Sequence, residues 1–147
     1  MKKVEIYTDG ACSFNPGPGG WGVVLIYKGR EKQMSGFCDN TTNNRMELLA
    51  VIKGLQELKE PCQVMLYSDS AYVVNAFEKK WIEDWSQKNW RTADKKEVKN
   101  LDLWQELFML SKKHDITWIK VRGHADNFYN NICDKLARSE IEKRQNI

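Results

Sequence analysis

The order of strand-like and helix-like segments restricts the fold of this chain more than any other feature of its sequence. Three segments with strand character come first, at residues 4–11, 21–28 and 30–37, and the last two are joined by a predicted tight turn at 28–30. Further elements then alternate: a helix that begins near 41–44 and ends before Pro61, a strand at 63–67, helices at 71–80 and 101–113, a strand at 116–121, and a helix that ends near Arg144. This order predicts an α/β fold with a mixed five-stranded sheet, three antiparallel strands followed by two parallel ones, and helices on both faces.

The composition is that of a globular protein and excludes several other classes. The 147 residues are enough for a single domain, and 41% hydrophobic with 29% charged residues is ordinary for such a chain. A net charge of +3 does not by itself indicate a nucleic-acid partner. Cys12, Cys38, Cys62 and Cys133 form no Cys-x-x-Cys pair, which favours free thiols in a reducing compartment. Because no apolar run is long enough for a signal peptide or a membrane span, we expect a cytoplasmic protein without a membrane partner.

An aspartate inside the first strand is the least expected residue of the predicted sheet. Asp9 lies near the end of the alternating segment at 4–11. The sequence NPGPGG at 15–20 follows it, and we expect this sequence to form a loop that reverses the chain into the second strand. An unpaired carboxylate in a protein interior costs several kcal/mol. Asp9 therefore needs a partner or a chemical function.

Three other acidic residues have a structural explanation when each is taken alone. Asp69 stands at a helix start, where the N-cap is the ordinary role. Glu47 follows Asn44 by three residues and could serve as a capping-box partner or complement the helix dipole. Asp134 lies within the last helix, where a solvent-exposed face is the simplest explanation.

The positions of these acids in the predicted sheet favour a shared function instead. Asp9 and Asp69 fall towards the ends of strands that could be neighbours, and Glu47 begins a connecting helix; ligands gather at this edge of α/β sheets. Carboxylates brought together there repel one another unless cations bridge them. Oxygen ligands without Cys or clustered His suit Mg²⁺ or Mn²⁺, and two such ions can promote phosphodiester cleavage.

A series of sequence fragments, in order over essentially the whole chain, resembles type 1 ribonuclease H of the bacterial, single-domain kind. The fragments are YTDGAC, NPGPGG, TTNNRMEL, SDSAYV, TADKKEVKN with DLWQ, VRGHA and CDKLAR. The resemblance implies a ribonuclease H-like fold over residues 1–147, without a separate hybrid-binding domain. It also implies an endonuclease that hydrolyses the RNA strand of RNA–DNA hybrids by two-metal-ion cleavage and leaves 5′-phosphomonoesters.

The same resemblance implies the residues of the catalytic site. Two Mg²⁺ ions, for which Mn²⁺ can substitute, would be held by Asp9, Glu47, Asp69 and Asp134. His124, in the loop after the last strand, would assist proton transfer or product release.

Residues for binding the hybrid are implied in two regions. Asn15 in the Pro–Gly loop matches a contact to the nucleic-acid backbone. Thr42, Asn43 and Asn44 match contacts near the minor groove, where ribose and deoxyribose differ. Residues 79–99 match a basic protrusion, a helix and loop that hold the DNA strand, and contribute Trp90, Lys95, Lys96 and Lys99. We expect Trp81 and Trp85 of the same segment to pack inward. With seven basic and five acidic residues, positions 78–99 carry a net charge of only +2.

Two other functions remain compatible with the residues themselves. One is a DNA nuclease of the same broad fold, integrase- or resolvase-like, which a strand-specific cleavage assay would distinguish. The other is a non-catalytic nucleic-acid-binding module, whose mark would be the loss of one of the four carboxylates, all of which are present. We expect a monomer without an obligate protein partner.

Overall fold

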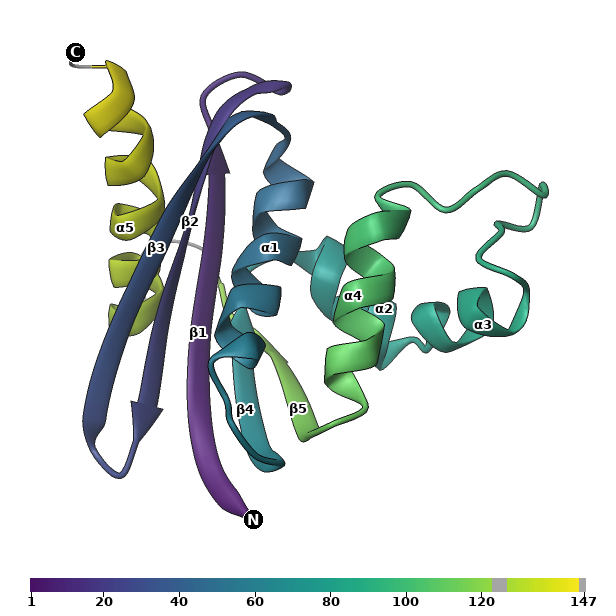
Figure 1. Cartoon of the computed structure of the whole chain (residues 1–147), viewed down its shortest axis with the longest axis horizontal. Coiled ribbons are helices and arrows are strands. Elements are labelled where there is room, and N and C mark those ends of the chain that lie inside the picture. Colours follow the sequence, from purple (N-terminus) through teal and green to yellow (C-terminus); the bar gives the residue numbers. More distant parts are fainter. Residues whose placement is uncertain (123–126, 146–147) are drawn as a thin grey trace.

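A computed structural model describes residues 1–122 and 127–145 of the chain. Its strands form one sheet in the order β3-β2-β1-β4-β5 (Figure 1). They are β1 (Lys2–Cys12), β2 (Gly17–Tyr27), β3 (Arg30–Thr41), β4 (Cys62–Ser68) and β5 (Asp115–Lys120). Strands β1, β2 and β3 pair in antiparallel fashion, whereas β4 runs parallel to β1 and β5 parallel to β4. The predicted mixed sheet is confirmed.

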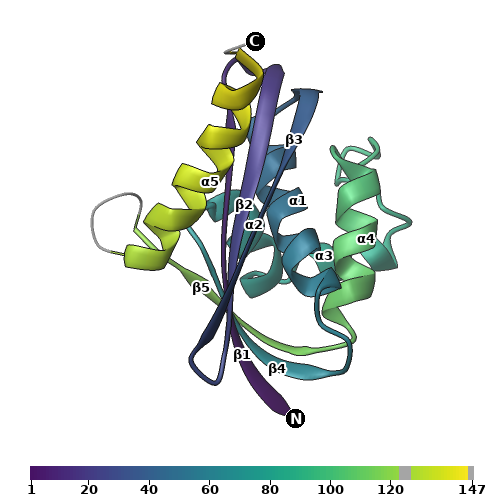
Figure 2. The ribbon, with the colours of Figure 1, turned by 60° about the vertical axis from the view of Figure 1, so that its left-hand side comes forward.

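Helices cover both faces of this sheet, also as predicted. They are α1 (Asn43–Gln56), α2 (Ala71–Glu78), α3 (Trp81–Gln87), α4 (Leu101–Ser111) and α5 (Phe128–Gln145). Figure 2 shows α5 and α1 on opposite faces of the sheet, and α4 beside α1. The main core, which includes Ile6, Leu48 and Leu66, joins α1, α2 and α4 to the sheet. A smaller cluster of Tyr7, Val24 and Cys133 joins the sheet to α5.

Strand β2 begins at Gly17, four residues before the predicted start at Trp21, so the prediction that 17–20 form a loop is wrong. Pro18 is tolerated because the pairing with β3 shifts register between Gly17 and Gly19. The glycines of β2 serve close packing: a Cβ atom at Gly20 would lie 2.2 Å from the carbonyl oxygen of Ala137 in α5. The missing side chains at Gly20 and Gly22 allow the α5 backbone to lie directly against the strand.

The protrusion begins with the short helix α3. Lys80, just before it, has a left-handed backbone with φ 59°, and this residue separates α2 from α3. Trp85 packs inward against Trp104, with ring centroids 5.4 Å apart. Trp81 does not: its side chain is 42% exposed and Lys79 lies over its ring, so the prediction that Trp81 packs inward is wrong.

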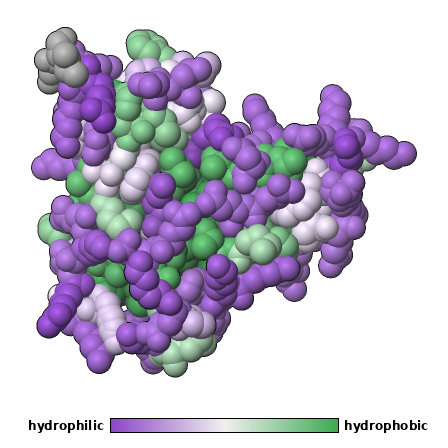
Figure 3. All heavy atoms as spheres, in the orientation of Figure 1, coloured by the Kyte–Doolittle hydropathy of each residue, from purple (hydrophilic) through white to green (hydrophobic). Residues whose placement is uncertain are grey.

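The rest of the protrusion is a hydrogen-bonded loop. A β-bridge joins Arg91 to Glu97, and the backbone N–H of Val98 donates to the carbonyl of Trp90 over 3.1 Å. Val98 is buried, and the half-buried Trp90 ring packs edge-on against Phe108. Figure 3 shows hydrophilic side chains over the outer end of the protrusion. The loop therefore rests on the core at two points while its charged residues face solvent.

The close approach of α5 to β2 generates a stability prediction. A Cβ atom at Gly22 would lie 2.3 Å from the backbone carbonyl oxygen of Cys133, which cannot move without shifting the helix. We expect Gly22→Ala to lower the free energy of unfolding by about 1–3 kcal/mol, measured by urea denaturation. Gly54→Ala is the comparison variant and should lose less stability: its Cβ atom would lie 2.9 Å from a side-chain methyl of Ile6 and not from helix backbone, and α1 gains about 1 kcal/mol of helix propensity. Equal stability of Gly22→Ala and the unsubstituted protein would contradict this account.

Candidate metal centre

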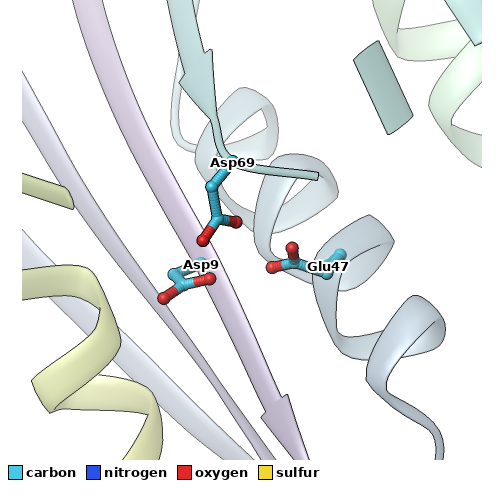
Figure 4. A group of neighbouring side chains, drawn as sticks. All are labelled: Asp9, Glu47 and Asp69. Carbon is cyan, nitrogen blue, oxygen red and sulfur yellow. The ribbon is translucent and has the colours of Figure 1, made fainter. Parts of the chain in front are cut away.

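Two of the predicted acidic residues lie side by side because of the register of two parallel strands. Tyr7 of β1 pairs with Tyr67 of β4, and the Thr8 hydroxyl donates to the Tyr67 carbonyl over 3.1 Å. Asp9 and Asp69 each come two residues after this pair, and Asp69 directly follows the end of β4, so both residues lie at the same edge of the sheet. Figure 4 shows their carboxylates pointing toward one another.

The third acid, Glu47, reaches the pair from α1 because a glycine lets the helix approach the strand. A Cβ atom at Gly10 would lie only 2.4 Å from the backbone nitrogen of Glu47. With no side chain there, the start of α1 lies against β1, and Glu47 points toward Asp9 and Asp69 (Figure 4). One oxygen from each of the three carboxylates lies within 4.8 Å of the others. The predicted convergence of these three acids is present in the structure.

Helix capping does not account for these acids, because other side chains perform it. The Ser70 hydroxyl accepts from the backbone N–H of Val73 and caps α2, although sequence alone offers this role to Asp69. Thr42 caps α1, which places Glu47 five residues after the cap, beyond the capping-box position. Asp69 and Glu47 are therefore available for another role.

Burial and mutual repulsion favour the protonated forms of two of the carboxyl groups, because both effects raise their pKa values. Asp9 and Glu47 are only 4% and 5% exposed. Burial, followed by the charge of Asp69, raises the pKa of Asp9 to about 8, although the Gly10 N–H donates to its carboxylate over 3.0 Å. Burial and then the charge of Asp9 raise the pKa of Glu47 well above its ordinary value.

The residues fit a divalent cation. Among the described residues, the Glu47 Oε1 atom is the one buried side-chain nitrogen or oxygen without a hydrogen-bond partner. Such an oxygen is costly unless a ligand binds it. The donor set consists only of carboxylate oxygens, which hard ions such as Mg²⁺ prefer. A bound cation would satisfy the orphan oxygen and offset the repulsion among the three acids.

Asp134 lies on α5, beside this group but outside it. Its side chain is 15% exposed and forms an ion pair with Arg138, and its charge contributes to the raised pKa of Asp9. The helix is held at this position partly by Asn130, a buried residue that the sequence did not single out, whose side-chain amide donates to the carbonyl of Thr8 over 3.4 Å. His124, the other predicted catalytic residue, lies outside the described residues.

The predicted hybrid-binding residues occupy two exposed regions. The Asn15 side chain accepts from the backbone N–H of Asn43 over 3.1 Å, so the β1–β2 loop lies at the start of α1 next to Asn44. In the protrusion, Lys95, Lys96 and Lys99 are exposed, and Lys96 lies 4.0 Å from Asp94.

Comparison with known proteins supplies the family. The family model described as RNase H matches residues 1–142. The chain belongs to the ribonuclease H family. Ribonuclease H of Acetivibrio thermocellus is 64% identical over 143 residues, which cover 97% of each protein. Ribonuclease H of Thermoanaerobacter pseudethanolicus is 63% identical over 145 residues, which cover 97% of this chain and 94% of that protein. The crystal structure of LC9-RNase H1, a type 1 RNase H with the type 2 active-site motif, aligns with a TM-score of 0.86 at 30% identity and covers 97% of this chain and 74% of that one.

Membership of the ribonuclease H family confirms the resemblance found in the sequence and the predicted fold. It also makes the chain a ribonuclease H enzyme rather than a non-catalytic binding module. The family uses divalent metal ions, and the acidic cluster of this chain can bind metal.

The raised pKa of Asp9 generates a pH-dependent stability prediction. In EDTA, folded Asp9 keeps its proton up to about pH 8, whereas the unfolded chain releases it near the ordinary value of 3.8. The folded state therefore binds more protons between these values, and its stability must fall as pH rises through them. We expect urea denaturation in EDTA to give a lower free energy of unfolding at pH 8 than at pH 5, and Asp9→Asn to reduce this loss by a few kcal/mol.

Asp39→Asn, at an exposed position, is the control and should lose as much stability between pH 5 and pH 8 as the unsubstituted protein does. Adding Mg²⁺ at pH 8 should raise the free energy of unfolding of the unsubstituted protein, and it should raise that of Asp9→Asn much less. An identical pH dependence in Asp9→Asn and the unsubstituted protein would show that Asp9 does not hold the proton.

Proposed function

We propose that this chain hydrolyses the RNA strand of RNA–DNA hybrids endonucleolytically at Asp9, Glu47, Asp69 and Asp134, with two Mg²⁺ ions and 5′-phosphomonoester products. Cleavage of the RNA strand follows from membership of the ribonuclease H family. The observation that carries the assignment of the site is the cluster of three carboxylates with an unpartnered Glu47 oxygen. Mn²⁺ can substitute, since it prefers the same ligands.

In this mechanism the side chains of the protein bind the cations and orient the substrate. Bound divalent ions supply an activated water nucleophile and stabilise charge on the phosphodiester. Asp9 and Glu47 lose their protons when cations bind, because only the carboxylate forms coordinate them. Asp134, on the neighbouring helix, completes the ligand set in this proposal, and His124 assists proton transfer or product release.

The hybrid is held on both sides of the cluster in this proposal. Thr42, Asn43 and Asn44 at the start of α1 contact the minor groove and read the 2′-hydroxyl groups of the RNA strand, while Asn15 beside them contacts the nucleic-acid backbone. The protrusion at 79–99 contacts the DNA strand through Lys95, Lys96 and Lys99. Trp90 is also among the residues proposed to contact the DNA strand; it is half-buried, and its ring packs against Phe108.

The remaining parts of the proposal concern the protein as a whole. We propose one catalytic domain over residues 1–147, acting as a monomer in the cytoplasm with the hybrid as its partner. Within 1–122 and 127–145, no helix combines the length and apolar character needed to cross a membrane.

Asp9→Asn should reduce cleavage at least about a hundredfold while the protein stays folded and binds hybrid. The amide keeps the shape of the side chain but cannot balance the cations. Asp69→Asn should have a similar effect, and since Ser70 caps α2, loss of a cap cannot explain it. The measurement is cleavage of a hybrid with each strand labelled separately, in Mg²⁺, Mn²⁺ or EDTA.

Only the RNA strand should be cut, and only with metal; Asp39→Asn serves as a control and should cut normally. Cleavage of the DNA strand would instead support a DNA nuclease of the same fold. Turnover by Asp9→Asn close to that of the unsubstituted protein would refute the assignment of the metal site.

Replacing Lys95, Lys96 and Lys99 together by Gln should raise KM and leave kcat nearly unchanged, because phosphate contacts hold ground and transition states alike. The slope of log affinity against log salt should flatten by about one for each phosphate that the lysines no longer neutralise. Gln at Lys2, Lys3 and Lys28, which lie at the N-terminal end of β1 and in the β2–β3 turn, removes the same charge as a control. A fall in kcat with unchanged affinity and salt slope would show that the protrusion does not hold substrate.

A further inference from the structure

A polar network connects the end of the protrusion to α1. The guanidinium group of Arg45 donates two hydrogen bonds to the carboxylate of Asp102, over 2.9 and 2.7 Å. The Arg45 Nη1 atom also donates to the Asn100 side-chain oxygen over 3.3 Å. Asn100 has a left-handed backbone, with φ 61°, at the point where the protrusion ends and α4 begins. The two parallel bonds between Arg45 and Asp102 fix direction as well as distance.

The same network continues to α2. The side-chain N–H of Asn100 donates to the hydroxyl oxygen of Tyr72 over 2.9 Å, and the indole N–H of Trp104 donates to the same oxygen over 3.1 Å. Trp104 is completely buried, so the Tyr72 hydroxyl gives its indole N–H a partner within the core. Asn100 therefore bonds to α1 through its oxygen and to α2 through its nitrogen.

These contacts join the protrusion to two segments that carry acids of the metal centre. Arg45 comes two residues before Glu47 on α1, and Tyr72 comes three residues after Asp69, in the first turn of α2. Figure 1 shows α1, α2 and α4 gathered at the base of the protrusion. The residues of the network lie outside the three-carboxylate cluster itself.

We propose that Arg45, Asp102, Asn100 and Tyr72 are positioning residues that fix the protrusion relative to the metal centre. The inference rests on the proposed function, since it assumes that the protrusion holds the hybrid while the acids cut it. A substrate that contacts both regions binds best when their separation is fixed in advance, because less conformational freedom is lost on binding. Weakening the network at Asp102 or Tyr72 should therefore weaken hybrid binding without removing a basic side chain.

Asp102→Asn distinguishes positioning from simple electrostatics, because the two explanations predict opposite changes in the affinity for the hybrid. Removing an acid beside a polyanion should strengthen binding if charge alone matters. Removing the partner of Arg45 should weaken it if the network positions the protrusion. We expect the Kd for a hybrid, measured by fluorescence anisotropy in EDTA, to rise about fivefold, as for loss of a well-oriented ion pair. KM should rise likewise, with kcat within about twofold and an unchanged salt slope.

Glu106→Gln is the matched control. Glu106 also lies on α4 and accepts a hydrogen bond from Gln56 of α1 over 2.8 Å, so the change removes one acidic charge and weakens one hydrogen bond between the same helices. Glu106 lies outside the network, so the Kd of the Glu106→Gln variant for the hybrid should stay within about twofold of that of the unsubstituted protein. Tyr72→Phe tests the other end of the network without changing charge and should raise Kd in the same direction as Asp102→Asn.

Melting temperatures establish that each variant is folded at the assay temperature. Backbone amide hydrogen exchange of residues 90–100 should be faster than in the unsubstituted protein for Asp102→Asn and for Tyr72→Phe, but not for Glu106→Gln. An affinity of Asp102→Asn equal to or above that of the unsubstituted protein would overturn the proposal. So would an equal loss in Glu106→Gln. Because Kd is measured without cleavage, this result is independent of whether the chain cuts the RNA strand.

Discussion

Repulsion among the carboxylates of Asp9, Glu47 and Asp69 is the interaction on which the rest of the structure depends. These groups lie within 4.8 Å of one another, and two of them are nearly inaccessible to water. Without a cation, this arrangement opposes folding, because the buried groups must either keep their protons or lose the hydration of their charges. The packing of the sheet and helices must offset that cost. A site assembled in this way favours the binding of divalent cations, since binding removes an unfavourable interaction already present.

Backbone packing places these charges more than side-chain contacts do. Gly10 allows α1 to lie against β1, and Gly20 and Gly22 allow α5 to lie against β2; a Cβ atom at any of the three would lie within 2.4 Å of helix backbone. The two helices carry Glu47 and Asp134 to opposite sides of the strand that carries Asp9. The glycines thus determine the geometry of acids that are distant from them in sequence.

Local patterns predicted most of the fold but not the contacts between elements. The turn at Lys28 and Gly29 forms as expected, with φ 50° and 77° at the two residues, and the alternating pattern placed β1 correctly. The start of β2 was missed because Gly and Pro usually interrupt strands, whereas here they serve helix packing and a register shift. The inward orientation expected for Trp81 was wrong: Ile82 is the buried residue of α3, and the Trp81 ring contacts Lys79 instead of the core. Convergence of three acids could be predicted from strand ends, but the role of Gly10 could not, since a steric clash is visible only in three dimensions.

The low charge of the protrusion makes its orientation important. Its basic residues exceed its acidic ones by only two over positions 78–99, and Lys88 and Lys96 lie within 4.0 Å of Asp84 and Asp94. Ion pairs at this level of exposure are weak, yet they reduce the field available to attract a phosphate backbone. In the proposed complex, long-range attraction is then small, and affinity depends on a few lysines reaching phosphates at defined positions. Such binding requires a rigid attachment of the protrusion to the metal centre, which is the role proposed for the contacts of Asn100 with Arg45 and Tyr72.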